Sequence, residues 1–482
     1  MRGGSLFLVL ALALGAVAVP LLSAAADEVV PWTLVLVLAA LMVGALAAER
    51  AREGFFDVFS PLALAVWATA EVALVPAVLR LVLPPGAVTA NGIPYVTPEL
   101  FAEALLLSII GFMAMYAGYV VGVGRRLGAM VPVPPADWHH GRAVVVAGAY
   151  ALIGVAAYAT LLASFGGMSG FLAVRARSAY VQDDSLFLFA GVVVMRVGVL
   201  VALTAWIFRR DAKRPSVGVI AFVVLVLALT LMLRGRGRVL SILVMALFMY
   251  HFGRRRIRFR QFAMLVVGAV GSLLLLDQAF AYMGGYELKS GAGLVRELGG
   301  SKKLDKLGSF LLVLRGIPAE LDFQWGSTIV AVPFDFVPDR WFPDHPEGAA
   351  HVFTRTFFPS AYQAGVGVPP SLWTELYMNF GAVGIAVGSF LLGLWLDALR
   401  HLGRVVRSHP GLLLVFVTLL YYTVSLQTTV LETSIPHMMM DVGPAAAAAL
   451  FVTRFRLHRQ QRPGAAPTGL GRPARPLTGT AG

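Results

Sequence analysis

A carboxylate, a phenol and an amide lie close together at the start of an apolar run near the C-terminus. Glu375, Tyr377 and Asn379 occupy alternate positions, and Gly381 and Gly384, which permit close helix packing, come next. Ionisable groups at the edge of a membrane helix are costly and usually serve function. Glu375 and Asn379 share a helix face because they are four residues apart. Glu375 is therefore a candidate general base for a hydroxyl group, with Asn379 orienting the base or the substrate.

A structural interpretation of Glu375 also stays open. If Pro369 and Pro370 lead into the helix, Ser371 is its N-cap and Glu375 lies in the first turns. The helix dipole favours an acidic residue there without any catalytic role. The sequence alone does not separate these two interpretations.

Three arginines alternate with glycines between two apolar runs, at Arg234, Arg236 and Arg238. The planar arginine fork matches phosphate oxygens, and glycine lets the backbone approach an anion closely. We expect this turn outside the membrane, where arginines in a short connection work against insertion. The three side chains are therefore candidates for an anion clamp. Snorkelling toward lipid headgroups, or a turn on the inside, remain the alternatives.

Further polar residues lie in two external segments. Arg175, Arg177 and Tyr180 follow a Gly-Gly pair in a re-entrant or surface amphipathic stretch, and they suit either substrate binding or an interfacial anchor.

The second segment is a long loop over 284–375, and the length of such loops usually indicates function or disorder. Its aromatic residues argue against disorder. We single out as binding candidates its residues Arg315, Arg340 and His345, and as rings for stacking Trp325, Trp341 and Tyr362. A folded polar lid with surface ion pairs is the alternative.

A few charges lie within or beside apolar runs, where they usually pair. They are Glu71, Arg196, Asp277, Glu432 and Asp441. Arg196 with Asp277 is one candidate pair among them. Glu432, together with His437 on the same external side, is a second-choice catalytic candidate.

Composition identifies a polytopic membrane protein. The 482 residues are 58% hydrophobic and 13% charged, against about 25% charged in soluble proteins. The net charge of +13 lies mostly in short loops between apolar runs, which indicates membrane topology and not nucleic-acid binding. Cysteine is absent, so disulfides, thiolate nucleophiles and cysteine metal sites are excluded.

The apolar runs predict about twelve spanning helices. They lie near 5–25, 29–48, 58–83, 98–123, 143–164, 185–208, 216–234, 238–252, 262–283, 376–399, 409–431 and 435–455. This divides the chain into nine helices over 1–283, the external loop 284–375, three helices over 376–455 and a disordered tail over 456–482. Cleavage of the first run as a signal peptide is the alternative for the N-terminus.

The arginine-rich connections give the orientation. The basic ones are 49–57, 124–142, 209–215, 253–261 and 400–408, and we place them with both termini in the cytoplasm.

The late motif resembles that of a known enzyme family. Pro370-Ser371, then Glu375-x-Tyr377-x-Asn379-Phe380-Gly381-x-x-Gly384, then a helix containing Leu391-Leu392-Gly393, resembles the late segment of the bacterial oligosaccharide repeat-unit polymerases, also called O-antigen or Wzy-type polymerases. Arg234-Gly235-Arg236 is similar to an element that in this family ends a membrane helix on the outside and is implicated in binding undecaprenyl diphosphate. The likeness over 165–180 is weaker, and elsewhere only the topology is similar.

The resemblance implies an all-α polytopic membrane fold with GT-C-like or Wzy-like architecture in the cytoplasmic membrane. It implies a glycosyltransferase that polymerises undecaprenyl-diphosphate-linked repeat units at the outer face. The catalytic residues would be Glu375, Arg236 and Arg315. The substrate-binding residues would be Arg234, Arg238, Arg175, Arg177, Tyr180, Arg340, His345, Tyr377 and Asn379.

The same resemblance implies no metal, nucleotide or other cofactor, and the sequence has no Walker, GxSxG, HExxH or Asp-x-Asp motif. The expected partners are the lipid-linked oligosaccharides, membrane lipids, and a chain-length regulator and flippase of the same pathway, with no nucleic acid. An O-antigen-ligase-like transferase and a polysaccharide-precursor flippase or transporter remain the alternatives. The crowding of polar groups toward the outer face, instead of along midplane helices, disfavours the transporter.

Overall fold

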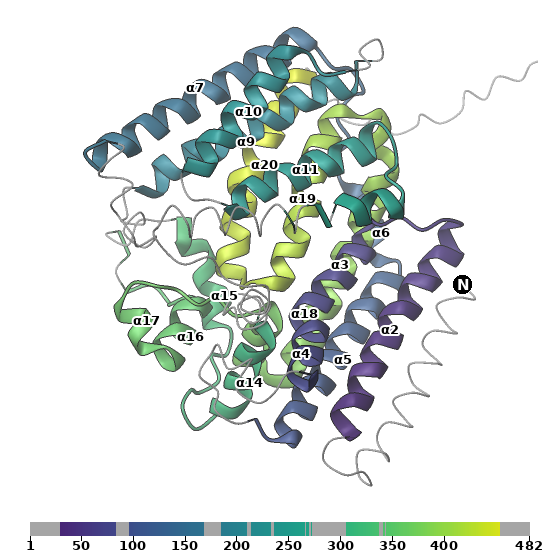
Figure 1. The fold of residues 1–482 in the computed structure, drawn as a ribbon, viewed down its shortest axis with the longest axis vertical. Coiled ribbons are helices and arrows are strands. Elements are labelled where there is room, and N and C mark those ends of the chain that lie inside the picture. The colour runs from purple at the N-terminus through teal and green to yellow at the C-terminus, as the bar shows by residue number, and fades with distance from the viewer. Residues whose placement is uncertain are drawn as a thin grey trace, which may run out of the picture.

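Helices form all the regular structure in the described part of the chain, and no strand is found there (Figure 1). The computed structural model describes residues 29–82, 96–167, 185–209, 214–232, 236–265, 267–268, 271, 305–336, 341–342 and 344–453. Seven of the helices are long and apolar enough to cross a membrane. The prediction of an all-α, multi-pass membrane protein is confirmed at this level.

The seven candidate spans coincide with predicted ones. They are α2 (Val29–Glu53), the continuous run of α3 (Pro61–Thr69), the π-turn η1 (Ala70–Leu74) and α4 (Val75–Val82), α5 (Pro98–Val120), α7 (His140–Ser164), α18 (Leu372–Val405) with η4 (Val406–Ser408), α19 (Pro410–Thr428) and α20 (Leu431–Thr453). Three further apolar helices occupy other predicted spans: α9 (Ser185–Ile207), α10 (Val217–Met232) and α11 (Arg236–Gly253). Span 5–25 and most of 262–283 lie outside the described residues, so the number twelve stays a prediction.

Glycines let α5 and α18 pack in close contact. A Cβ atom on Gly118 of α5 would lie 2.1 Å from the carbonyl oxygen of Phe390, and one on Gly393 of α18 would lie 2.0 Å from that of Met115. Backbone cannot yield as a flexible side chain can, so only glycine fits at either position. α6 (Val123–Met130) extends the same contact along α18. Small residues are what membrane helix interfaces use for close approach.

The chain of α18 turns back on itself near its start. Ser371 is its N-cap, as predicted, and the helix begins before the predicted span 376–399. Phe380 and Gly381 leave helical geometry, Gly381 with φ +62°. The Trp373 indole N–H donates to Ser389 Oγ at 3.0 Å, although 16 residues separate the two. A straight helix would place them roughly 24 Å apart. The first turns of α18 therefore run back beside its own later turns.

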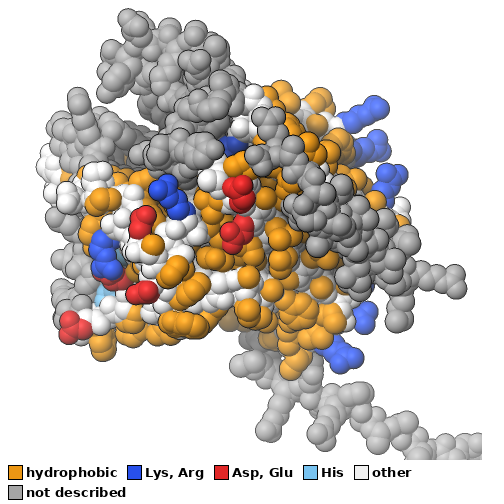
Figure 2. Space-filling model, turned by 90° about the horizontal axis from the view of Figure 1, so that it is seen from below, with side chains coloured by type: hydrophobic (Ala, Val, Ile, Leu, Met, Phe, Trp, Pro, Cys, Tyr) orange, Lys and Arg blue, Asp and Glu red, His pale blue; other side chains and the backbone are white. Residues whose placement is uncertain are grey.

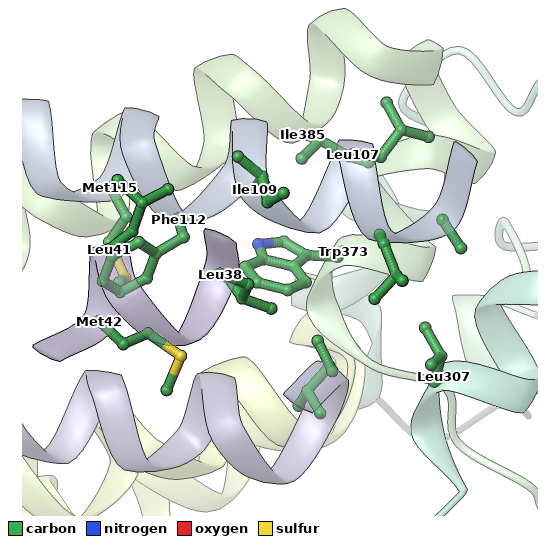
Figure 3. Packing of buried hydrophobic residues seen from close by; sticks show 14 of the residues in the cluster. Leu38, Leu41, Met42, Leu107, Ile109, Phe112, Met115, Leu307, Trp373 and Ile385 are labelled. Atoms are coloured by element: carbon green, nitrogen blue, oxygen red, sulfur yellow. The ribbon is translucent and has the colours of Figure 1, made fainter. Parts of the chain in front are cut away.

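Trp373 anchors this folded-back segment in the hydrophobic core. Figure 3 shows its indole among side chains from three helices, with Leu38 of α2 and Ile109 of α5 close by. Gly384, expected to pack against a neighbouring helix, instead contacts its own chain, because a Cβ there would lie 2.3 Å from the Leu376 carbonyl oxygen.

Part of the predicted external loop is buried in the bundle. α14 (Lys306–Gly316) buries Leu307, Phe310 and Leu311 in the core that α5 and α18 share. The shorter helices beyond it lie toward the lower left of Figure 1: α15 (Ser327–Ala331), the 3-10 turn η3 (Val332–Phe336), α16 (Ala349–Phe357) and α17 (Pro359–Gln363).

An ion pair fixes the start of α14 to a spanning helix. Arg80 of α4 donates to Asp305 at 2.5 Å, and the other carboxylate oxygen of Asp305 accepts the Gly308 N–H at 2.8 Å. Burial raises the pKa of Asp305, and the Arg80 guanidinium partly offsets that effect. This contact links residues 225 positions apart in the sequence.

Candidate functional site

Glu375 lies where α15, α18 and α20 meet, and its side chain is fully buried. Its Oε2 accepts the Leu431 N–H at 2.7 Å, and its Oε1 accepts the Thr328 hydroxyl at 3.3 Å. Leu431 is the first residue of α20, so Glu375 caps a neighbouring helix, where the helix dipole stabilises a negative charge. The carboxylate thus has a structural role in this conformation, whatever chemistry it performs.

Asn379 holds the chain before α15 against the break in α18. Its Oδ1 accepts the Gly326 N–H at 2.8 Å, and its carbonyl oxygen accepts the Trp325 N–H at 3.2 Å. Its Nδ2 donates to Thr328 Oγ1 at 2.7 Å. Glu375 and Asn379 therefore share Thr328, which confirms that they lie on one face. Thr328 was not among the predicted site residues, since nothing in its local sequence indicates a contact with a distant helix.

Trp325 is held in an unusual backbone conformation above this junction. Its φ is +48°, a region that bulky residues rarely occupy. Its side chain is 75% exposed, and its nearest recorded ring contact is Phe323 at 5.9 Å. Strained residues that the surroundings over-determine often mark ligand sites. An exposed indole on a fixed backbone offers a flat apolar surface for a ring-shaped ligand.

A second aromatic group links η3 to the residues that follow it. Phe334 stacks on His345 with ring centroids 5.9 Å apart and contacts Phe342 edge-on at 6.1 Å. The side chains of Phe342 and its neighbour Trp341 are exposed. Figure 2 shows hydrophobic, acidic and basic side chains mixed over the lower end of the molecule as drawn in Figure 1. His345 is thus packed within an aromatic cluster, and its Nδ1 lies 2.8 Å from the Pro346 carbonyl oxygen.

Tyr377 packs away from the carboxylate. Its ring meets Phe310 at 5.9 Å and Phe323 at 6.1 Å, and its hydroxyl has no recorded hydrogen bond to a described residue. Arg315 lies in the last turn of α14 with its side chain exposed, and it makes no recorded ion pair among the described residues. The structure does not bring Arg315 into contact with Glu375.

The predicted anion clamp is described only in part. Arg236 begins α11, its side chain is not described, and Arg234 lies outside the described residues, as do Arg175, Arg177, Tyr180 and Arg340. The Arg238 side chain is half-buried, and its carbonyl oxygen accepts the Ser241 hydroxyl at 2.7 Å. Ser241 in turn accepts from Arg196 at 2.9 Å. Arg238 therefore borders a buried polar cluster that joins four helices.

Arg196 has Asp441 as its partner among the described residues, and not the Asp277 that the sequence suggested as one candidate. The guanidinium contacts both oxygens of Asp441, with Nε to Oδ1 at 3.2 Å, and donates to the Tyr422 hydroxyl at 3.2 Å. Asp277 itself lies outside the described residues. Asp441 lies roughly 15 Å beyond Leu431 along α20, from the rise per residue of a helix. The cluster and Glu375 thus contact the same helix at different depths.

Glu432 is a second buried carboxylate close to Glu375. Its Oε2 accepts the Ala350 N–H at 2.9 Å in the first turn of α16, and its Oε1 lies 3.6 Å from His351 Nδ1. A Cβ atom on Gly348 would lie 2.0 Å from this carboxyl group, so a side chain there would displace the carboxylate from its present position. Glu432 and Glu375 therefore play matching roles at the starts of two helices.

Comparison with known protein families, curated proteins and solved structures finds no match for this chain. Among the described residues, no three His, Cys, Asp or Glu side chains are arranged to hold a metal ion. The site geometry therefore carries the functional argument, together with the likeness of the sequence motif.

Proposed function

We propose that this protein is a membrane glycosyltransferase that joins oligosaccharide repeat units carried on a lipid diphosphate. The observation that carries the proposal is the junction at the break in α18, where a buried carboxylate and a buried amide hold the segment that carries the exposed indole of Trp325. A base, an orienting amide and a ring-stacking surface are what transfer to a sugar hydroxyl requires. The motif likeness over 370–393 supports the same chemistry.

The reaction is a substitution at the anomeric carbon of the donor glycan. The acceptor hydroxyl oxygen forms a bond to that carbon, and the bond from the carbon to the diphosphate oxygen breaks, its electron pair leaving with the diphosphate. Glu375 takes the proton of the hydroxyl. The arginines around the start of α11, Arg234, Arg236 and Arg238, stabilise the charge on the departing diphosphate, with Arg315 available from α14.

Access to Glu375 requires a rearrangement. Thr328 and the start of α20 cover the carboxylate in the described conformation. The acceptor hydroxyl therefore replaces the Thr328 hydroxyl, which takes a movement of the chain around 324–328. A helix of five residues such as α15 has few bonds to hold it in place. Because Trp325 and Thr328 lie in the same short segment, sugar binding at Trp325 would displace Thr328 from Glu375 at the same time.

The proposed setting is the cytoplasmic membrane, with the junction on the outer face and the arginine-rich connections inside. The assignment of these two sides follows from the distribution of arginines among the connections. The partners in this proposal are the lipid-linked substrates, together with the flippase that delivers them and a regulator of chain length.

The test is gel analysis of surface and lipid-linked glycan in a deletion strain complemented with wild type, Glu375→Gln or Arg236→Ala. We expect single repeat units in place of a ladder in the deletion strain and in both variants, with the variant proteins still in the membrane. Unattached full-length polymer would indicate a ligase. Internal accumulation with no surface material would indicate a flippase.

Glu432→Gln is the matched control. Glu432 and Glu375 are both carboxylates that accept a backbone N–H at the start of a helix, and glutamine keeps an accepting oxygen in each. If capping alone mattered, the two variants would behave alike. A normal ladder in Glu375→Gln would remove Glu375 from catalysis, and loss confined to Glu432→Gln would transfer the base to Glu432.

A further inference from the structure

A cavity of about 240 Å³ lies beside the C-terminal end of α18, whereas the proposed site lies near the start of that helix. Residues from the end of α2, the start of α3, the end of α11 and the end of α18 form its walls. These segments belong to the predicted basic connections 49–57, 253–261 and 400–408, which meet here. Four arginines line the cavity: Arg256, Arg400, Arg404 and Arg407.

Arg400 is the buried member of this group, with 7% of its surface exposed. Its Nη2 pairs with Asp397, and its guanidinium lies over the Tyr119 ring, 4.7 Å from the centroid. Its Nη1 is buried and has no hydrogen-bond partner among the described residues. A buried donor without a partner costs about 1–3 kcal/mol, more for a charged group. An acceptor in the cavity would remove that cost.

The carboxylates of the cavity are already engaged. Glu53 accepts from Arg404 at 2.5 Å, and Glu49 accepts the hydroxyl of Tyr119 at 2.6 Å. Asp57 lies 3.0 Å from His251 Nε2. Burial alone would raise the pKa of Asp57, but the hydrogen bond and charge of His251 lower it below its usual value. The Asp57 carboxylate is therefore already engaged by the His251 side chain.

Arg256 and Arg407 form no direct ion pair among the described residues, although the charge of Asp57 acts on both. Arg256 lies over the Phe55 ring, 3.8 Å from its centroid, which fixes the guanidinium and leaves its N–H groups for a ligand. Arg407 lines the same cavity from η4. The two guanidinium charges repel each other, and an added anion between them would reduce that repulsion.

We propose that this cavity is a binding site for a phosphate group, held by Arg400, Arg256 and Arg407. Phosphate oxygens accept from several guanidinium groups at once, and a charge-assisted bond to the buried Nη1 of Arg400 completes its donors. The position at the membrane edge admits either the headgroup phosphate of an anionic lipid or a soluble phosphate. The site is independent of the proposed transferase chemistry, since none of its residues contacts the Glu375 junction.

The test measures binding to the full-length purified protein. Nanodiscs of phosphatidylcholine alone, and of phosphatidylcholine with phosphatidylglycerol, provide the lipid probe, and inorganic phosphate added to the former provides the soluble one. We expect one of the two probes to raise the melting temperature of the wild type. Arg256→Gln/Arg407→Gln should weaken binding of that probe at least tenfold, because each lost hydrogen bond from a charged donor is worth about 1.5–3 kcal/mol.

Arg142→Gln is the control, because Arg142 is a half-buried arginine that contacts Phe451 and lies outside the cavity. It should bind the probe as the wild type does. A response to phosphatidylglycerol alone assigns a lipid headgroup, and a response to inorganic phosphate assigns a soluble ligand. The proposal is overturned if neither probe stabilises the wild type, or if the double variant and Arg142→Gln bind equally well. Arg400 is left unchanged because its loss would strand Asp397.

Discussion

At the scale of single residues, buried carboxylates in this protein accept backbone N–H groups at the starts of helices. Glu375 does so for α20 and Glu432 for α16, and Asp397 accepts the Arg125 N–H at 2.7 Å in α6. The first N–H groups of a helix lack partners within it, and hydrocarbon offers none. Burial of a carboxylate is therefore no sign of catalysis here. What distinguishes Glu375 is the strained, exposed Trp325 beside it.

Trp325→Gly separates strain from function at that residue. Glycine occupies positive φ without the steric penalty that a left-handed residue otherwise carries, roughly 1–2 kcal/mol. The indole is largely exposed, so its removal loses little packing. We expect the melting temperature in detergent to stay level or rise, while the glycan ladder shortens because the ring no longer stacks on the sugar.

Trp341→Gly provides the comparison. Trp341 is also exposed, at 66%, but its φ is not positive, so glycine there brings only added chain entropy and destabilises by about 0.5–1 kcal/mol. A Trp325→Gly protein that melts lower than Trp341→Gly would show that the left-handed backbone is not strained. A full-length ladder from Trp325→Gly would take the indole out of the sugar site.

At the scale of elements, the apolar runs predict most helices but not how the chain of one helix bends. The span near 376–399 reads as one apolar stretch, and its fold-back depends on Gly381 in a left-handed conformation and on Trp373 reaching Ser389. Glycine at such a place also occurs in straight helices, so the sequence does not distinguish the two. The cap on α20 and the burial of α14 likewise depend on contacts far apart in sequence.

Gly393→Ala tests the contact between α5 and α18. The added methyl group would meet the Met115 carbonyl oxygen, and the two helices would have to separate. We expect a loss of about 1–3 kcal/mol, the usual effect of overpacking, measured as a lower melting temperature in detergent. Gly148→Ala in α7 is the control, since nothing lies within 4 Å of its added atom. There alanine should stabilise by roughly 0.5–1 kcal/mol. Equal melting of the two variants would mean that α5 and α18 are not closely packed.

At the scale of the whole molecule, a buried polar cluster lies within one of the two groups of helices that the hydrophobic cores define. One core is built around α2, α5 and α18, and another around α9, α11, α19 and α20. The Arg196 cluster lies among the latter helices, with Ser241 on α11, Tyr422 on α19 and Asp441 on α20. The charges themselves were identified from the sequence, but the pairing was not, since several acids in apolar runs were equally plausible partners.

Asp441→Leu should strand the Arg196 charge and destabilise the protein strongly, by about 3–5 kcal/mol, as loss of one partner from a buried pair does. Replacing both, Arg196→Met with Asp441→Leu, should recover much of that loss, because an apolar pair of similar volume is often as stable as the ion pair. The measurement is the melting temperature in detergent, with the amount of protein in the membrane as a second readout.

The glycan ladder in the double variant then separates two roles for Arg196. A stable double variant with a normal ladder makes Arg196 purely structural. A stable double variant without polymer places Arg196 in the anion site beside Arg238, since the fold would be intact and only the guanidinium missing. A double variant no more stable than Asp441→Leu would contradict the pairing as the source of the instability.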